Sequence, residues 1–205
     1  VGWGTTFFDY DNDGWMDLVV VNGHVYPQMA HVKMGGSASY QQRKLFYRNK
    51  RDGTFDEIGL ELGEVFTEPT VSRGLGLGDL DNDGRMDLVV NVLDGTPQIL
   101  HNEFRLPPSG GTFSTPGHWL LVKLEGSGLM TDAIGALIKV KTGEVTRTRL
   151  IRSGTSYLSQ EDMRQHFGLG SAAKADSVEV LWPDGTTTVK KNVEADQLLV
   201  IKQSG

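Results

Sequence analysis

The amino-acid sequence predicts an all-β protein, with a partial β-propeller followed by a small β-sandwich or barrel. Three observations lead to this prediction. An acidic motif occurs twice, 70 residues apart, and each copy is flanked by apolar runs. The longest apolar runs have only four or five residues, as expected of short strands. Glycine is abundant, with 26 in 205 residues, and many of these glycines fall between the runs, where turns are expected.

The composition excludes several classes of protein. Acidic residues number 26 and basic residues 20, which argues against general nucleic-acid binding because that function needs clustered Lys and Arg. No apolar run is long enough for a membrane-spanning helix. The chain has no Cys, which removes disulfide scaffolds, Cys-ligated zinc and cysteine nucleophiles.

Charge divides the chain into two regions. Residues 1–103 hold 16 acidic and 8 basic residues, whereas residues 104–205 hold 10 acidic and 12 basic residues. Between these regions, a Pro/Gly/Ser run from Leu106 to Gly111 has the composition of a linker. The predicted division is two propeller blades in residues 1–105, a linker in 106–117 and a second β-domain in 118–205.

The repeat defines a structural unit in the first region. Residues 9–20 recur as residues 79–90. Each copy is followed by a second β-like run that ends at Asn49 or Asn102, and a Gly turn at 51–55 leads into another strand. A unit of strand, acidic loop, strand, turn and strand at this spacing is typical of the four-stranded blades of a propeller.

Both acidic loops predict a calcium site. Each has Asp at positions 1, 3, 5 and 9 and Gly at position 6, so four carboxylates surround one tight turn. These charges repel one another unless a divalent cation neutralises them, and Ca²⁺ best tolerates an irregular shell of about six to eight oxygens. The residue at position 7 is expected to add its backbone carbonyl. The predicted ligands of the two Ca²⁺ ions are Asp9, Asp11, Asp13, Trp15 and Asp17, and Asp79, Asp81, Asp83, Arg85 and Asp87.

Two other interpretations of the loops stay open. An EF-hand loop shares the first six positions, but it needs Glu at position 12 and flanking helices. Position 12 is Val20 or Val90 here, and the flanking residues are β-branched and glycine-rich. An acidic hairpin turn without metal is the other interpretation, and two matching copies make it less favoured than a calcium site.

The spacing of the motif also resembles a known family. The pattern Gly-x-x-x-x-Asp-x-Asp-x-Asp-Gly-x-x-Asp-Leu runs from Gly4 to Leu18 and again from Gly74 to Leu88. It is similar to the FG-GAP/VCBS repeat of integrin-type β-propellers. The resemblance implies that the Ca²⁺ ligands of that family fall on the eight aspartates named above, with none missing in either copy.

The second region is predicted to consist of short strands with Gly turns, in a β-sandwich or small barrel. Its motifs, including His-Phe-Gly-Leu-Gly from His166 and Leu-Trp-Pro-Asp-Gly from Leu181, resemble the ASPIC/UnbV domain. That domain follows FG-GAP blades in secreted bacterial proteins, and its ligand is poorly defined. We expect strands at 118–124, 136–141, 145–151, 177–182, 186–190 and 197–202, with one helical turn within 160–166.

The sequence contains no arrangement that predicts catalysis. The five His residues form no zinc-binding helix, and His166 is expected to be a packed, hydrogen-bonded turn residue. Ser156 lies in a Gly-x-Ser-x-x context that fails the nucleophile-elbow pattern at Leu158. The Gly-x-Gly-x-Gly run from Gly74 is better explained as a glycine-rich inner strand than as a nucleotide loop. The paired carboxylates have calcium-loop spacing, so we do not expect glycosidase chemistry or any other enzyme activity.

The first unit carries an insertion. Asp9 and Asn49 are 40 residues apart, but Asp79 and Asn102 only 23, so about 17 extra residues fall between His24 and Gln42. Long insertions in a propeller usually lie on a rim. We interpret this one either as a contact for a partner, a ligand or a soft metal, or as a variable surface loop.

These features favour an extracellular or periplasmic calcium-binding module for adhesion or assembly, because cytosolic Ca²⁺ is too scarce for such sites. Two blades cannot close a propeller, which needs at least about four. We therefore expect missing blades before Val1, or other subunits, to complete it, and a protein or glycan partner. The alternative is a glycan-binding or non-catalytic module of a larger secreted enzyme, with exposed aromatic residues at Trp3, Trp15, Tyr26 and Tyr40.

Overall fold

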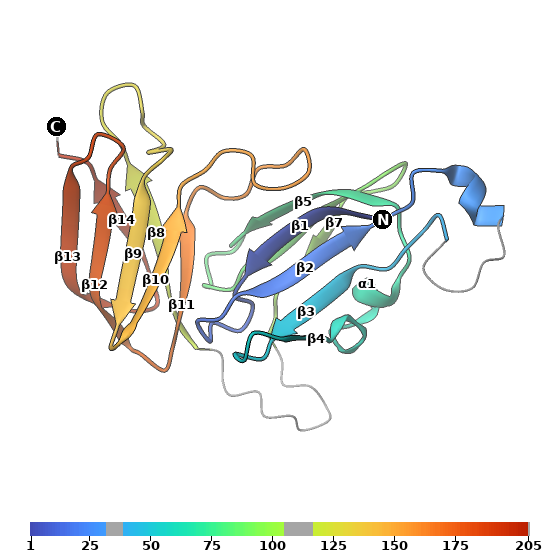
Figure 1. Ribbon diagram of the computed structural model, residues 1–205, viewed down its shortest axis with the longest axis horizontal. Helices are drawn as coiled ribbons and strands as arrows, with labels where there is room; N and C mark the ends of the chain where they lie inside the picture. Colours follow the sequence, from blue (N-terminus) through green and yellow to red (C-terminus); the bar gives the residue numbers. More distant parts are fainter. Residues whose placement is uncertain (32–38, 105–116, 205) are drawn as a thin grey trace.

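The computed structural model describes residues 1–31, 39–104 and 117–204. It consists of two β-rich halves that lie side by side, with the N-terminus in one half and the C-terminus in the other (Figure 1). The described strands form four sheets, and none of these sheets closes on itself. Strands make up most of the described elements, so the predicted all-β class is confirmed. None of the described helices is long and apolar enough to cross a membrane.

Each copy of the repeat forms one antiparallel sheet. The first strand of each sheet ends where the acidic loop begins, and the second strand begins at the last Asp of the motif. Three short helical segments, η1 (Pro27–His31), η2 (Gly59–Glu61) and α1 (Glu64–Thr67), lie in the connections. The strands are β1 (Gly2–Phe8), β2 (Asp17–Asn22), β3 (Leu45–Asn49) and β4 (Phe55–Glu57) in the first sheet, and β5 (Ser72–Gly78), β6 (Asp87–Val92) and β7 (Gln98–Leu100) in the second.

The two sheets of the first half pack front to back, as neighbouring propeller blades do. Val19 on β2 is fully buried in the apolar core between the sheets, together with Leu88 on β6. The repeat makes Val89 the counterpart of Val19, yet Val89 is 37% exposed. Side chains alternate between the faces of a strand, so the second sheet buries the face opposite to the one that the first sheet buries.

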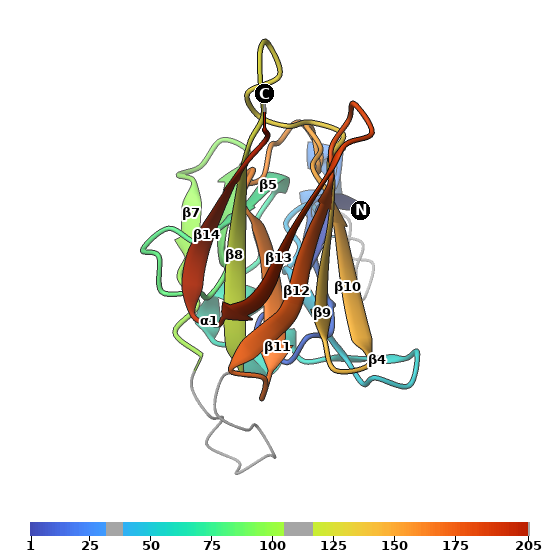
Figure 2. The ribbon, with the colours of Figure 1, turned by 90° about the vertical axis from the view of Figure 1, so that its left-hand side faces the viewer.

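The second half is a pair of facing sheets. One core contains buried residues from both sheets, including Leu120, Val140 and Trp182. Figure 2 turns this half toward the viewer, with its strands running from top to bottom. The strands are β8 (His118–Glu125), β11 (Gln165–Gly170) and β14 (Gln197–Lys202) in one sheet, and β9 (Leu137–Thr142), β10 (Val145–Leu150), β12 (Lys174–Leu181) and β13 (Thr187–Glu194) in the other.

The structure corrects two details of the sequence-based prediction. The helical turn expected within 160–166 is wrong, because Gln165 and His166 begin strand β11 and no helix is assigned to 160–164. Strand β11 is hard to recognise in the sequence because it is short, Gln-His-Phe-Gly-Leu-Gly, and two of its six residues are glycines, which are depleted in strands. In the described residues the second blade has three strands rather than four. Most of the predicted linker, residues 106–116, lies outside the described residues.

A segment of the second half runs along the free edges of β1 and β5 (Figure 1). The hydroxyl of Ser156 accepts a hydrogen bond of 3.1 Å from the backbone N–H of Thr5, and that of Ser159 accepts one of 3.1 Å from Leu75. The N–H of Asp162 donates to the carbonyl of Leu77 at 2.8 Å. These bonds satisfy edge-strand groups that would otherwise be open to pairing with another chain.

Candidate metal centres

The first acidic loop is held in shape by its own carboxylates. Asp9 accepts hydrogen bonds from the backbone N–H groups of Asp13, at 3.0 Å, and Gly14, at 2.7 Å. Asp17 accepts from the N–H of Tyr10 at 3.3 Å and from that of Asn49 on β3 at 2.8 Å. The turn is possible because Gly14 has a φ of +89°, where a side chain would be strained.

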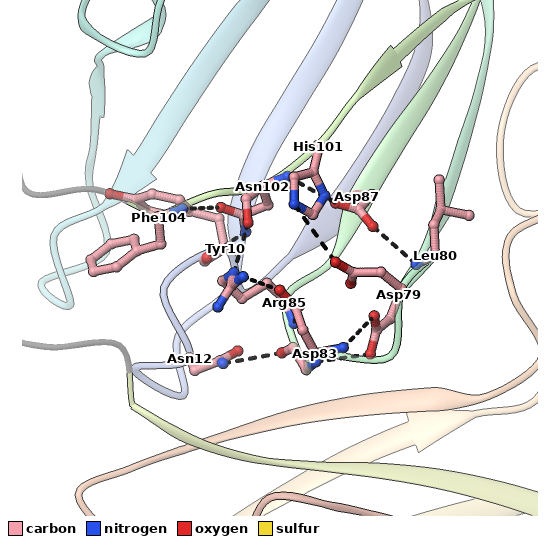
Figure 3. Close-up of polar contacts among 12 residues, drawn as sticks. Tyr10, Asn12, Asp79, Leu80, Asp83, Arg85, Asp87, His101, Asn102 and Phe104 are labelled. Atoms are coloured by element: carbon pink, nitrogen blue, oxygen red, sulfur yellow. Dashed lines mark hydrogen bonds and ion pairs between the residues drawn. The ribbon is translucent and has the colours of Figure 1, made fainter.

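The second loop repeats this arrangement residue by residue. Asp79 accepts from the N–H groups of Asp83 and Gly84, at 3.1 and 3.0 Å. Asp87 accepts from Leu80 at 2.9 Å and from Asn102 at 2.8 Å (Figure 3). The two loops therefore have the same hydrogen-bonding scheme, and the flanking segments are strands rather than the helices that an EF-hand requires.

Three of the four predicted carboxylates of each loop converge on one small volume, and Asp17 and Asp83 stand outside these two groups. Oxygens of Asp9, Asp11 and Asp13 lie within 4.8 Å of one another, and those of Asp79, Asp81 and Asp87 do the same. An ion that binds oxygens at Ca²⁺ distances reaches ligand atoms up to about 5 Å apart. The geometry and the all-oxygen donors of these groups fit a Ca²⁺ ion.

Several carboxylates of the loops are buried. Burial, reinforced by the charges of Asp13 and Asp11, raises the pKa of Asp9 well above its ordinary value. Burial also raises the pKa of Asp17 to about 7 and raises that of Asp79. These shifts mean that ionised carboxylates are costly in the loops as they stand, and a divalent cation would offset that cost.

Arginine and histidine side chains flank the loops in different ways. In the first loop Arg48 lies 3.7 Å from Asp11, and Arg51 lies 2.5 Å from Asp13. In the second loop Arg85 forms an ion pair with Asp83, and His101 contacts both Asp87 and Asp81. Position 7 differs as well, because the Trp15 side chain is 45% exposed whereas Arg85 donates to the carbonyl of Asn102 at 2.7 Å.

The second half of the chain covers both loops. Backbone N–H groups of Gly117 and Gly170 donate to the carbonyls of Asp11, at 3.0 Å, and Asn12, at 2.9 Å. His166 on β11 is buried and contacts the Gly84 carbonyl through Nε2 at 3.2 Å. His166 is therefore packed and hydrogen-bonded as expected, but it lies in a strand rather than in a turn.

Several residues at this contact were missed in the sequence. Arg147 donates to the carbonyl of Gly14 at 3.2 Å, and Arg164 donates to the side chain of Asn82 at 2.7 Å and to the carbonyl of Asp79 at 2.8 Å. Asn12 and Asn82 could have been found in the sequence, because Asn stands at position 4 of both motif copies. In the structure they have left-handed φ values of +60° and +61°. Nothing in the sequence pointed to Arg147 and Arg164, because they lie far from the loops along the chain.

The aromatic residues proposed for glycan binding do not share one rim. Trp3 lies near the start of β1, with Arg73 4.4 Å above its ring and Tyr157 packed at 4.8 Å, whereas Trp15 follows the end of β1. Tyr26 is 63% exposed beside His24. Within the His24 to Gln42 insertion the described part contains η1, and residues 32–38 lie outside the described residues.

Comparison with known families agrees with this architecture. Residues 36–90 match the FG-GAP-like repeat, and residues 126–205 match the ASPIC and UnbV family. The chain carries an FG-GAP-like repeat and an ASPIC/UnbV domain. The resemblance predicted from the motifs is thus confirmed, and the domain that covers the two loops is the ASPIC/UnbV domain.

Relatives with this architecture are longer proteins. The chain is 29% identical over 194 residues to cartilage acidic protein 1 of Homo sapiens, and 28% identical to that of Mus musculus. The Xenopus tropicalis protein of the same name is 27% identical over 192 residues. These alignments cover 93%, 93% and 92% of this chain but 26% of each relative, so the chain spans about a quarter of their length.

Proposed function

We propose that this chain is a non-catalytic calcium-binding module of a secreted protein and that it serves adhesion or assembly. The observation that carries the proposal is the pair of acidic loops with the same fold and with carboxylate oxygens within 4.8 Å of one another. Asp9, Asp11, Asp13 and Asp17 would hold one Ca²⁺, with the carbonyl of Trp15. Asp79, Asp81, Asp83 and Asp87 would hold the other, with the carbonyl of Arg85.

Calcium would act as a structural ion. Each loop joins the first two strands of a blade and touches the ASPIC/UnbV domain, so a cation there stabilises the blade and the domain contact together. A site with a Kd of about 0.1 mM, in a medium with about 1 mM Ca²⁺, contributes roughly 1.4 kcal/mol to stability. Extracellular fluid supplies that concentration and the cytosol does not, which supports a location outside the cytosol.

The test is calorimetric titration of chelator-treated protein with CaCl₂, together with thermal melts with and without Ca²⁺. The double variant Asp11→Asn/Asp13→Asn should lose one Ca²⁺ and most of the calcium-dependent stabilisation of the first loop. The matched control Asp94→Asn/Asp132→Asn removes two exposed charges outside the loops and should bind Ca²⁺ as the parent does. Equal melting losses with calcium and with chelator would refute a structural calcium ion.

We also propose that further blades complete the propeller. The outer faces of the blade pair carry exposed apolar residues, including Phe7 and Phe55 on one side and Val89 and Ile99 on the other. The repeat relates these faces to the faces that are buried between the blades, so a blade of the same kind fits either side. Intact mass of the natively purified protein tests this. A mass far above 22.5 kDa favours blades within one longer chain, and a mass near that value favours other subunits.

A further inference from the structure

We propose that the second loop also accepts a transition-metal cation such as Zn²⁺, with His101 as a nitrogen ligand beside Asp81 and Asp83. This site rests on the proposed cation binding of the loops. It differs from the first loop in that it takes a transition-metal cation through a nitrogen ligand. Imidazole is a preferred ligand of Zn²⁺, whereas Ca²⁺ binds through oxygen.

The three side chains already face one another. Ligand atoms of Asp81, Asp83 and His101 lie within 4.8 Å of one another, and Nε2 of His101 is 3.7 Å from Oδ2 of Asp81. Two ligands at Zn²⁺ distances of about 2.0–2.2 Å lie roughly 3.3 Å apart in a tetrahedral shell. Closing the site therefore needs only a small movement of partly exposed side chains. Arg85 forms an ion pair with Asp83, and the metal would replace this partner.

A buried carboxylate orients the imidazole. Oδ1 of Asp87 accepts a hydrogen bond of 2.8 Å from the N–H of Asn102, and Oδ2 accepts one of 2.9 Å from the N–H of Leu80. Oδ1 also lies 2.9 Å from Nδ1 of His101 (Figure 3). An ionised carboxylate only accepts, so Nδ1 carries the proton and Nε2 offers its lone pair toward Asp81. A carboxylate on the second nitrogen is the usual support of a metal-binding His.

The first loop lacks this nitrogen ligand. The repeat places Arg48 one residue before Asn49, as His101 precedes Asn102. The guanidinium of Arg48 lies 3.7 Å from Asp11, but it stays protonated and offers no lone pair. The two loops therefore share a carboxylate scheme but differ in the side chain that approaches it, and only the second loop offers mixed nitrogen and oxygen ligands.

The test titrates the chelator-treated chain of 205 residues with ZnCl₂ and, separately, with CaCl₂, using calorimetry. His101→Asn keeps an N–H donor for Asp87 but removes the ligand nitrogen. His118→Asn is the matched control, since His118 is also paired with an Asp, at 2.6 Å from Asp196, but belongs to no cluster of three possible ligands among the described residues. Nitrogen NMR of the imidazoles reports coordination directly, and thermal melts in chelator check folding.

The expected result is one Zn²⁺ bound by the parent and by His118→Asn, with at least about a 10- to 100-fold loss of affinity in His101→Asn. The Nε2 signal of His101 should shift on Zn²⁺ addition, while Ca²⁺ binding by the first loop stays unchanged. Equal Zn²⁺ affinity in parent and His101→Asn, or equal loss in His118→Asn, would overturn the inference. If the parent chain binds Zn²⁺ but neither loop binds Ca²⁺, the proposed calcium function is refuted and the zinc site stands.

Discussion

The side-chain amide of Asn12 donates a hydrogen bond of 3.1 Å to the carbonyl of Gly84, so position 4 of the first loop is bonded to position 6 of the second (Figure 3). The same carbonyl contacts Nε2 of His166 in the ASPIC/UnbV domain. Asn102, at the end of the second blade, donates to the carbonyl of Tyr10 at 2.8 Å. The two loops and the second domain therefore meet at shared backbone groups. A substitution in one loop should change the stability of the other loop and of the domain contact.

Asn12→Ala should lower the free energy of unfolding by about 1 kcal/mol more than Asn82→Ala does. This difference is the typical contribution of one buried hydrogen bond. The two residues have the same left-handed backbone, so each variant carries the same conformational cost. Asn12 is buried and bridges the loops, whereas Asn82 is exposed and loses only an exposed hydrogen bond from Arg164. Urea unfolding in chelator measures the difference. Equal losses would mean that the buried bridge contributes no more than the exposed bond between Arg164 and Asn82.

Gly84→Ala should weaken the contact between the two halves. A Cβ on Gly84 would lie 1.9 Å from the Trp119 ring, and the φ of Gly84 is +83°. Gly53→Ala is the control, because Gly53 has a φ of +87° and no atom within 4 Å of the added Cβ. Both variants carry backbone strain, but only Gly84→Ala adds overpacking, which costs typically 1–3 kcal/mol.

Thermal melts and Trp fluorescence of these glycine variants separate strain from overpacking. Gly84→Ala should melt well below Gly53→Ala and should change the emission of the Trp residues. Identical melting temperatures would show that Trp119 adapts to the added methyl group.

The sequence was sufficient for the parts of the fold that repeat locally. The aspartate spacing predicted the β1–β2 and β5–β6 hairpins and the convergence of carboxylates, because these depend on neighbours within about ten residues. Strand β11 was missed because Gly168 and Gly170 are more typical of a turn than of a strand. The short helix α1 was missed as well, since only Phe66 in it is buried and four residues give no helical period.

The contact between the halves could not be predicted, because it depends on main-chain atoms. Gly117 and Gly170 contact carbonyl groups of the first loop, and backbone groups carry no residue-type signal. The contacts of His101 within the second loop were missed as well. The repeat aligns His101 with Arg48, but its contact with Asp87 depends on how the strands pair.

Lowering the pH should destabilise the protein through His166. Burial, aided by the nearby charge of Arg149, lowers the pKa of His166 to about 4 from its ordinary value of 6.5. The unfolded chain therefore takes up a proton more readily than the folded chain. The contribution of neutral His166 to the free energy of unfolding is fully present above pH 6.5. It is lost as the pH falls toward 4, by about 3 kcal/mol in all.

The variant His166→Gln isolates this effect, because Gln keeps an N–H donor but does not titrate. The buried aspartates, whose pKa values are raised by burial, change stability in the opposite direction, and they are the same in both proteins. Urea unfolding at pH 7 and pH 4.5 should show a smaller loss in His166→Gln than in the parent. Parallel losses in the two proteins would contradict a neutral, buried His166.

Gly168→Ala should weaken calcium binding by the first loop, although Gly168 lies in the other domain. A Cβ on Gly168 would lie 1.9 Å from Oδ2 of Asp9 and 2.8 Å from the carbonyl carbon of Asn12. The carboxylate of Asp9 must then move, and it would lose its hydrogen bond from Gly14. Gly168 is not among the residues with positive φ, so the substitution adds no backbone strain and its cost, typically 1–3 kcal/mol, comes from crowding.

Gly76→Ala is the matched control for this crowding, because its added Cβ would find its nearest neighbour at 3.6 Å. Calorimetric titration with CaCl₂ should show weaker binding at one of two sites in Gly168→Ala and unchanged binding in Gly76→Ala. The second loop serves as an internal reference, since the three atoms nearest an added Cβ on Gly168 all belong to the first loop. If Gly168→Ala lowers the melting temperature but leaves both affinities intact, the domain contact and the first metal site are independent. If one affinity falls with stability, the ASPIC/UnbV domain and the first loop form a single binding unit.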